Sequence, residues 1–209
     1  MDIIYTILIF VLAYLLGSIP TAVWMGKVFY NIDVREHGSG NAGFTNAMRV
    51  LGIRAGIPVL LIDIAKGFFA VFLVNLFPEN DLSDFNSQLF PILLGLLALF
   101  GHIFPIMAQF RGGKGVATGL GLLLGLYPLG AGLALAVFVL VLFTTRFISL
   151  GSILASISFP IWVIIWYNGE NISLLVFSFF LTALILFTHR NNIKRLIKGE
   201  EKRIYFRKG

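Results

Sequence analysis

A run of small and polar residues, HGSGNAGFTNAMR, occupies residues 37–49 between two apolar stretches. Its serine, threonine and asparagine side chains can donate hydrogen bonds, and its glycines allow successive backbone N–H groups to wrap around an anion. Arg49 adds a positive charge at the end of the run. We expect an anion-binding loop here, although the same composition is also typical of a flexible loop followed by a helix cap at Thr45 or Asn46.

A second glycine-rich run, FRGGKGVATG, occupies residues 110–119 and follows GHIFP at residues 101–105. Arg111 and Lys114 stand before an apolar helix, and a helix amino terminus next to cations favours bound phosphate. A glycine follows Lys114 where a Walker A loop has serine or threonine, so this is not a nucleotide-binding P-loop. Anchoring by positive charge would explain the two cations but not the glycines among them. For three further glycines we expect close helix packing instead: Gly119, Gly121 and Gly125.

We expect phosphate to be bound by both runs. In the first run, the binding residues are expected to be Gly38, Gly40, Asn41, Thr45 and Asn46. In the second run, they are expected to be Arg111, Gly112, Gly113 and Gly115.

A third polar stretch, THRNNIKRL, follows the last apolar run at residues 188–196. His189 is a candidate titrating group near neutral pH, and Asn192 would share its face if one helix continues through both. A histidine at this position is also common as an interfacial residue, and His37 and His102 carry the same alternative. Asp63 and Lys66, spaced i and i+3 inside an apolar run, are expected to pair, either for function or to orient the first loop.

The composition places these residues in a membrane protein. The chain has 209 residues, of which 58% are hydrophobic and 12% charged, and its mean hydropathy is +0.91. Lipid must therefore supply the solvent. The sequence contains no cysteine, which excludes disulfides, thiolate metal sites and an acyl-cysteine intermediate. With no carboxylate cluster either, we expect no metal site and no cofactor.

Apolar runs cover residues 3–25, 55–77, 89–110, 116–143, 148–167 and 172–187. Several are close to the roughly 20 residues that a spanning helix needs. The first run has no basic segment before it and no small-residue cleavage site, so we interpret it as a retained span. The run 116–143 contains Tyr127-Pro128-Leu129-Gly130, in which proline and glycine indicate a turn, so the run can form one long helix or two shorter ones.

The distribution of charge decides between one helix and two. Residues 78–88 contain three acids and no base, and residues 168–171 contain only Glu170, so both segments are expected outside. The basic segments, residues 27–54, residues 111–114, Arg146 and the tail, can all lie inside only if residues 116–143 cross twice. We therefore expect an all-α integral membrane protein in which residues 1–209 form one domain. Its bundle would have seven transmembrane helices, some of them short, with the amino terminus outside and the carboxyl terminus cytoplasmic.

The net charge of +6 does not indicate a nucleic-acid partner. Eight of the sixteen Lys and Arg residues lie in residues 190–208, directly after the last apolar run. Such a juxtamembrane tail is typical of a topology signal and of attraction to anionic membrane lipid. No aromatic side chains alternate with these charges as they do in nucleic-acid interfaces.

Together these stretches resemble the bacterial acyl-phosphate:glycerol-3-phosphate acyltransferase family of the PlsY type. The matching stretches are GSIP at residues 17–20, GSGNAGFTNAMRVLG at 38–52, GHIFP at 101–105, FRGGKGVAT at 110–118, RFISL at 146–150 and HRNNIKRL at 189–196. Their order and spacing over nearly the whole chain make the resemblance specific. Phe44 departs from the pattern, which usually has alanine there, and this puts acceptor or acyl-chain preference in doubt.

The resemblance implies transfer of a fatty acyl group from acyl phosphate to the 1-hydroxyl of sn-glycerol 3-phosphate, giving lysophosphatidic acid and phosphate. It places the active site at the cytoplasmic face of a bacterial inner membrane. It also implies that Ser39, Arg49 and Lys114 hold the acyl-phosphate head and the developing oxyanion. His189 and Asn192 would orient glycerol phosphate. The resemblance implies nothing about protein partners.

Two questions remain open at this point. The hydroxyl proton can pass to His189 or to the substrate phosphate, and we favour the phosphate because cationic surroundings would keep His189 neutral, as a donor. The alternative function is a transporter or channel for an organic phosphate, but transporters commonly show repeats and helices broken at the midplane. A purely structural scaffold would leave the glycine and asparagine loops unexplained.

Overall fold

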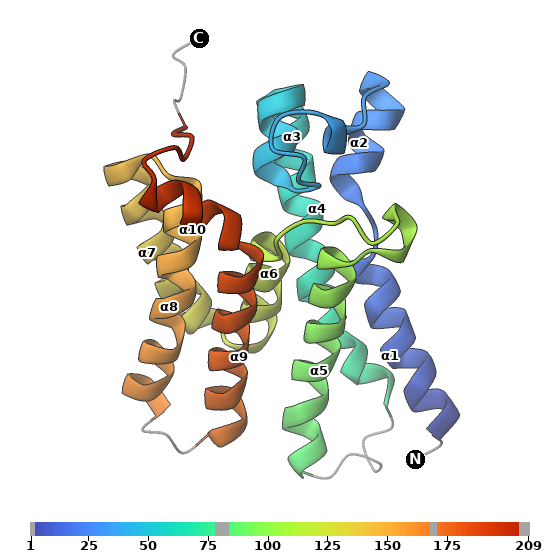
Figure 1. Cartoon of the computed structure of the whole chain (residues 1–209). Helices are drawn as coiled ribbons and strands as arrows, with labels where there is room; N and C mark the ends of the chain where they lie inside the picture. The colour runs from blue at the N-terminus through green and yellow to red at the C-terminus, as the bar shows by residue number, and fades with distance from the viewer. Residues whose placement is uncertain (1–2, 78–83, 168–170, 205–209) are drawn as a thin grey trace. The chain divides into compact units, whose positions relative to one another are not determined.

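The computed structural model describes residues 3–77, 84–167 and 171–204 (Figure 1). Throughout these residues the regular structure is helical, and they contain no strand. The all-helical architecture expected from the sequence is therefore confirmed. Of the two segments expected outside the membrane, residues 78–83 and 168–170 lie outside the described residues.

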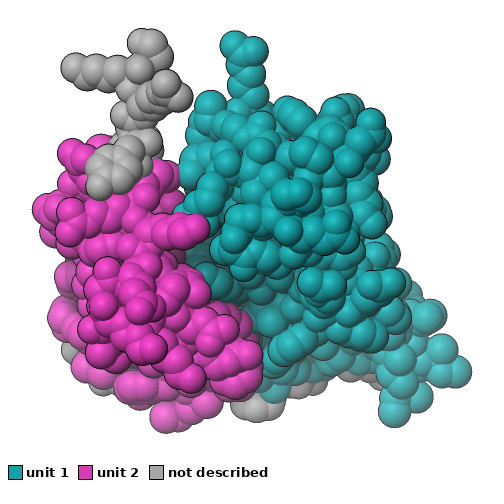
Figure 2. Space-filling model, turned by 45° about the horizontal axis from the view of Figure 1, so that its top comes forward, with its two compact units in different colours: residues 1–126 teal, residues 127–209 magenta. Residues whose placement is uncertain are grey.

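The contacts within the chain divide it into two compact units, residues 1–126 and 127–209, coloured separately in Figure 2. Each is described by itself. The α-helices of the first unit are α1 Ile3–Gly17, α2 Thr21–Tyr30, α3 Phe44–Leu51, α4 Ile53–Phe72, α5 Asp84–Ile103 and α6 Val116–Leu126. Its short 3₁₀ helices are η1 Val34–Glu36, η2 Leu73–Leu76 and η4 Ile106–Ala108. The second unit contains α7 Pro128–Thr145, α8 Ile148–Tyr167, α9 Ile172–Thr188 and α10 Arg190–Ile197.

In the first unit, α4 is the central helix, in contact with α1, α2, α3, α5 and α6. Figure 1 shows α2 and α3 at the same end of this unit as the carboxyl end of α5. In the second unit, α8 packs between α7 and α9, and α10 contacts α8 and α9. The polar loops of each unit are thus carried by the ends of apolar helices.

Four helices in the described residues are long and apolar enough to cross a membrane, and up to six spans result if each bent pair counts as one. The bent pairs are α1 with α2, at 48°, and α9 with α10, at 64°. The helix α6 is an additional, shorter apolar helix. These helices are what an integral membrane protein requires.

The first predicted span, residues 3–25, is not one straight helix but α1 followed by α2. Pro20 lacks the N–H that would continue the α1 ladder, so the helix ends and a new one starts at Thr21. A side chain on Gly17 would collide with the backbone carbonyl of Ala98, so the end of α1 lies directly against α5.

The predicted break in residues 116–143 is confirmed, because α6 ends at Leu126 and α7 begins at Pro128. Proline at the first position of α7 has no N–H to leave unsatisfied and its φ suits a helix start. The helix α6 has 11 residues, so it is one of the short helices that the predicted break implies. Gly121 of α6 lies against the carbonyl of Ile64 in α4, which confirms the packing role expected for this glycine.

One continuous helix, the condition under which Asn192 would share a helical face with His189, is not present. The chain bends by 64° between α9 and α10, and His189 is the residue between them. Its carbonyl still accepts a hydrogen bond from the N–H of Ile193, at 2.9 Å, so Asn192 stays within one turn of it. Both side chains are buried.

Candidate active site

Asn46 organises the first glycine loop from inside. Its Oδ1 accepts a hydrogen bond from the N–H of Ser39 at 2.8 Å, and its Nδ2 donates to the carbonyls of Val34 at 2.7 Å and His37 at 3.1 Å. Gly38, at φ +66°, lies so close to Oδ1 that a side chain there would collide with it. The amide of Asn46 therefore fixes the shape of the loop, and α3 starts after Gly43 rather than at a Thr45 or Asn46 cap.

The backbone of this loop is less available to an anion than its glycines suggested. The N–H of Ser39 bonds to Asn46, and the N–H of Gly40 bonds to the carbonyl of His37 at 3.1 Å. The N–H of Ala42 points to the carbonyl of Gly112, 3.4 Å away. Among the side chains of this run, those of Ser39 and Arg49 belong to exposed residues.

Arg35 joins the first loop to the segment that precedes the second. It donates from Nη2 to Oδ2 of Asp33 at 2.7 Å and from Nη1 to the carbonyl of Ala108 at 2.8 Å. The hydrogen bonds from Arg35 outweigh burial and, with Lys27, hold the pKa of the Asp33 carboxyl well below its usual range. In return, Asp33 raises the pKa of the Arg35 guanidinium. With the Ala42–Gly112 contact, the hydrogen bond from Arg35 to the carbonyl of Ala108 keeps the two loops together.

The glycines of the second loop let the chain lie on the end of α5. A side chain on Gly112 would collide with the carbonyl of His102, and one on Gly113 with the His102 ring. Gly115 adopts φ +86°, which favours glycine, and it faces Leu99. Packing against α5 thus accounts for all three glycines.

The two cations of the second loop differ in how exposed they are. Arg111 is exposed and Lys114 is half-buried, two residues before the start of α6 at Val116. The first unit carries the predicted residues of both loops, which touch where the N–H of Ala42 donates to the carbonyl of Gly112. These are Gly38, Ser39, Gly40, Asn41, Thr45, Asn46 and Arg49 from the first loop and α3, and Arg111, Gly112, Gly113, Lys114 and Gly115 from the second.

A buried ionic network lies behind these loops. Oδ1 of Asp63 is 2.8 Å from Nζ of Lys66, which confirms the predicted pair. The same oxygen accepts a hydrogen bond from Thr21 at 3.1 Å and lies 3.5 Å from Nδ1 of His102. Lys66 also donates to the carbonyl of Ile19 at 3.1 Å. The pair is therefore tied to the turn between α1 and α2 and to α5, not to the first loop.

In the second unit, His189 is held in one tautomer. Its Nδ1 is 2.9 Å from the carbonyl oxygen of Ile185, which can only accept, so Nδ1 carries the proton. A neutral His189 then has its lone pair on Nε2. In this tautomer a neutral His189 offers an acceptor at Nε2 instead of the donor expected from the sequence.

Glu201 accepts hydrogen bonds from three polar side chains of the second unit. Ser149 and Asn192 donate to its Oε1 at 2.7 and 2.6 Å, and Arg195 donates to its Oε2 at 2.7 Å. Burial opposes ionisation of this carboxyl, but the three hydrogen bonds outweigh burial and lower the pKa of Glu201. Two of its partners, Ser149 and Asn192, lie in stretches that the sequence singled out.

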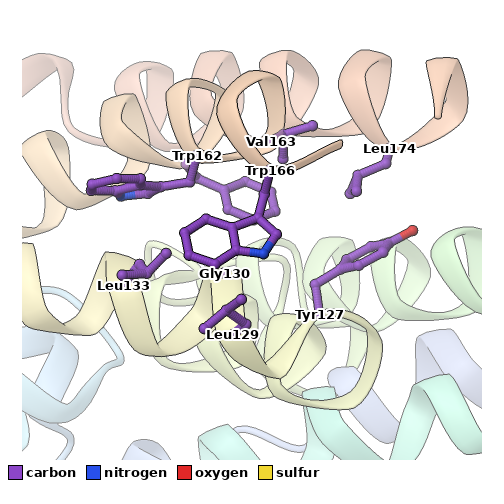
Figure 3. A pocket seen from close by; sticks show the side chains of 9 residues that line it. Tyr127, Leu129, Gly130, Leu133, Trp162, Val163, Trp166 and Leu174 are labelled. Atoms are coloured by element: carbon purple, nitrogen blue, oxygen red, sulfur yellow. The ribbon is translucent and has the colours of Figure 1, made fainter. Parts of the chain in front are cut away.

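The second unit contains a pocket that is lined mainly by apolar and aromatic side chains. It is lined by Tyr127, Leu129, Gly130, Leu133, Phe159, Trp162, Val163, Trp166 and Leu174 (Figure 3). These residues provide an apolar and aromatic lining without a cation for a phosphate group. Elsewhere, within the described ranges, no three His, Asp or Glu side chains are grouped to hold a metal ion.

Sequence reasoning missed Arg35, Asp33 and Glu201. Arg35 and Asp33 stand in a short charged segment before the first loop. Nothing in that segment indicates that Arg35 pairs with Asp33 and also donates to the carbonyl of Ala108. Glu201 lies among the basic residues of the tail. An acidic residue in that setting could have indicated a specific side-chain partner within the chain.

The comparisons with known proteins agree with each other. A family model described as glycerol-3-phosphate acyltransferase matches residues 7–199. The chain is 40% identical over 227 residues to the glycerol-3-phosphate acyltransferase of Chlorobium phaeobacteroides (strain BS1), covering 96% of this chain and 97% of that protein. It is 46% identical over 198 residues to glycerol-3-phosphate acyltransferase 2 of Bacillus anthracis, covering 95% and 98%.

Among solved structures, the chain is similar to PlsY (YgiH), an integral membrane glycerol 3-phosphate acyltransferase. The glycerol 3-phosphate form of that protein matches with a TM-score of 0.84 and 34% identity, covering 95% of each chain. Its lysophosphatidic acid form matches with a TM-score of 0.82. By sequence and by structure, the chain belongs to the glycerol-3-phosphate acyltransferase family.

Proposed function

We propose that this integral membrane protein transfers a fatty acyl group from acyl phosphate to the 1-hydroxyl of sn-glycerol 3-phosphate. The products are lysophosphatidic acid and inorganic phosphate, in the first step of phospholipid synthesis. The observation that carries the proposal is the joining of the two glycine loops by Arg35 and Ala42. The similar PlsY structures, in their glycerol 3-phosphate and lysophosphatidic acid forms, support the acceptor and the product.

Two phosphorylated substrates repel each other, so the site must supply positive charge. In the proposed site, Ser39, Arg49 and Lys114 hold the acyl-phosphate head and the oxyanion that develops on the acyl carbonyl. The surrounding residues bind phosphate or shape the loops: Gly38, Gly40, Asn41, Thr45, Asn46, Arg111, Gly112, Gly113 and Gly115. His189 and Asn192 orient glycerol 3-phosphate.

The reaction needs no covalent intermediate, because acyl phosphate is a mixed anhydride with a good leaving group. The 1-oxygen of glycerol phosphate attacks the acyl carbon, the new ester bond forms, and phosphate leaves with the electron pair of the broken C–O bond. The tautomer of His189 revises the route of the proton. With its lone pair on Nε2, His189 takes the hydroxyl proton and passes it to the departing phosphate.

The proposal includes a membrane arrangement. Residues 1–209 act as one transferase domain with seven spans, in which each bent pair is one span and α6 is the short seventh. The amino terminus lies outside and the carboxyl terminus inside the bacterial inner membrane. The excess of Lys and Arg in the loops and tail predicted to lie inside supports this orientation, in which the site faces the cytoplasm.

The test is phosphate release by the purified full-length protein. With palmitoyl phosphate and glycerol 3-phosphate, we expect phosphate and lysophosphatidic acid in equal amounts. Palmitoyl-CoA and palmitoyl-acyl carrier protein are the control donors, and turnover with either of them but not with the acyl phosphate would refute the proposed donor. His189→Asn keeps an N–H near the position of Nδ1 but has no lone pair at Nε2, so we expect it to lose most activity. Full activity of this variant would exclude His189 as the base.

A further inference from the structure

His102, at the carboxyl end of α5, touches two features that are distant in sequence. On one side its Nδ1 lies 3.5 Å from Oδ1 of Asp63. On the other side its carbonyl accepts a hydrogen bond from the N–H of Gly113 at 3.0 Å. A Cβ on Gly113 would fall on the Nε2 edge of the imidazole, so the loop backbone lies directly on the ring. His102 itself is 6% exposed.

The Asp63 side of this contact is held firmly. Lys66 and Thr21 also bond to Oδ1 of the carboxylate, and Lys66 bonds in turn to the carbonyl of Ile19. Breaking or shifting a buried ion pair is costly because each charge depends on its partners. The carboxylate therefore fixes the orientation of the His102 ring, and the ring fixes how closely Gly113 approaches α5.

We infer that His102 is a positioning residue for Lys114. The network of Asp63 and Lys66 sets the place of the imidazole, the imidazole supports Gly113, and Gly113 sets the starting point of the Lys114 side chain. This inference rests on the proposed function, in which Lys114 binds the acyl-phosphate head. His102 does not touch the reacting atoms; it acts through the loop that carries the cation.

Two substitutions test the contact from its two sides. His102→Asn keeps an N–H near the position of Nδ1 for Asp63 but removes the ring edge beneath Gly113. Gly113→Ala keeps the ring and forces the loop away from it, because the added Cβ collides with the imidazole. The matched control is Gly132→Ala in α7, where nothing lies within 4 Å of the added Cβ. A misplacement of about 1 Å in a reacting group can cost as much as a hundredfold in rate.

The experiment is a double-mutant cycle in the full chain, with kcat, KM and the melting temperature measured for each variant. We expect His102→Asn and Gly113→Ala each to lower kcat at least about tenfold, with melting temperatures near that of the wild type, and Gly132→Ala to leave kcat unchanged. In a Lys114→Ala background, each should lower the residual rate by less than about twofold, because the cation they position is gone.

The outcomes separate the two claims. Full kcat in both variants would overturn the inference. It would also be overturned if each substitution lowered kcat by the same factor in the Lys114→Ala background as in the wild type, since a purely structural defect acts independently of Lys114. If His102→Asn does not fold, the Gly113→Ala cycle carries the same prediction. Near-normal turnover by Lys114→Ala alone would instead refute the proposed role of Lys114, and the inference with it.

Discussion

Nδ2 of Asn192 donates a hydrogen bond to Oε1 of Glu201 across 2.6 Å. The amide proposed to orient glycerol 3-phosphate is thus itself oriented by a carboxylate of the carboxyl-terminal segment. Ser149 donates to the same oxygen. The following residues keep that segment in place, because the N–H of Ile204 donates to the carbonyl of Arg146 at 2.9 Å.

Glu201→Gln should lower stability in a way that depends on pH. The pKa of Glu201 is lowered from its ordinary value of 4.5. A carboxyl with a depressed folded-state pKa stabilises fully above its unfolded value and loses that contribution as pH falls through the folded value. The wild type should therefore melt several degrees above Glu201→Gln near neutral pH, and the gap should narrow below pH 4.5. Circular dichroism in detergent measures both. Glu200→Gln, at the exposed neighbour, is the control, and a gap that does not change with pH would contradict the prediction.

Lys114→Ala and Arg49→Ala should each remove most activity from a folded protein. Stabilisation of one developing charge is worth about 3 kcal/mol, or roughly a hundredfold in kcat. Lys114→Arg should also be impaired, because a planar guanidinium does not replace a compact ammonium. Arg54→Ala, at an exposed cation early in α4, is the control and should retain activity. Turnover near that of the control in Lys114→Ala would leave this lysine only an anchoring role.

Arg35→Lys should loosen the connection between the two glycine loops. Lysine keeps the charge beside Asp33 but cannot also reach the Ala108 carbonyl with a second nitrogen. Loss of a buried charge-assisted hydrogen bond costs about 2 kcal/mol, so we expect a lower melting temperature and a lower kcat. The control is Lys27→Met, because Lys27 pairs with the same Asp33 at 3.3 Å but is 55% exposed and should contribute little. Equal effects of the two substitutions would sink the proposed role of Arg35.

Ser39 should act as a hydrogen-bond donor and not as a nucleophile. Its hydroxyl is exposed on a loop that has no Gly-x-Ser-x-Gly elbow. We expect Ser39→Ala to lose much of the activity, and no acyl group to be attached to wild-type protein mixed with labelled acyl phosphate alone. Mass spectrometry after quenching measures this. Stoichiometric acylation of Ser39, released by glycerol 3-phosphate at the catalytic rate, would overturn direct transfer and make His189 the base for a covalent route.

The seven-span arrangement predicts which positions an impermeant thiol reagent reaches in intact cells. Cysteines at Ser87 and Asn168 should be labelled from outside, and a cysteine at Lys198 should be labelled only after lysis. Lys198 is exposed, whereas Ser149 at the start of α8 is buried and bonded to Glu201, so it is a poor reporter. Because the sequence contains no cysteine, the unmodified protein is the blank. Labelling of Lys198 but not of Asn168 in intact cells would refute the orientation.

Several features followed from the sequence because their causes are local. Apolar runs of spanning length predicted the helices, and Tyr127-Pro128-Leu129-Gly130 predicted the break between α6 and α7, since proline suits the first position of a new helix. The i,i+3 spacing of Asp63 and Lys66 predicted their ion pair because helical geometry brings such side chains together. The order of the polar motifs predicted the family, which the comparisons show.

The tertiary structure alone decided which distant residues these local elements bring together. Glu201 meets Ser149 across 52 positions, and Arg35 meets the Ala108 carbonyl across 73. His102 supports Gly113 only because α5 ends where the second loop returns. No periodicity or motif encodes such pairs, because each depends on how helices pack and on which buried polar groups must find partners once water is excluded.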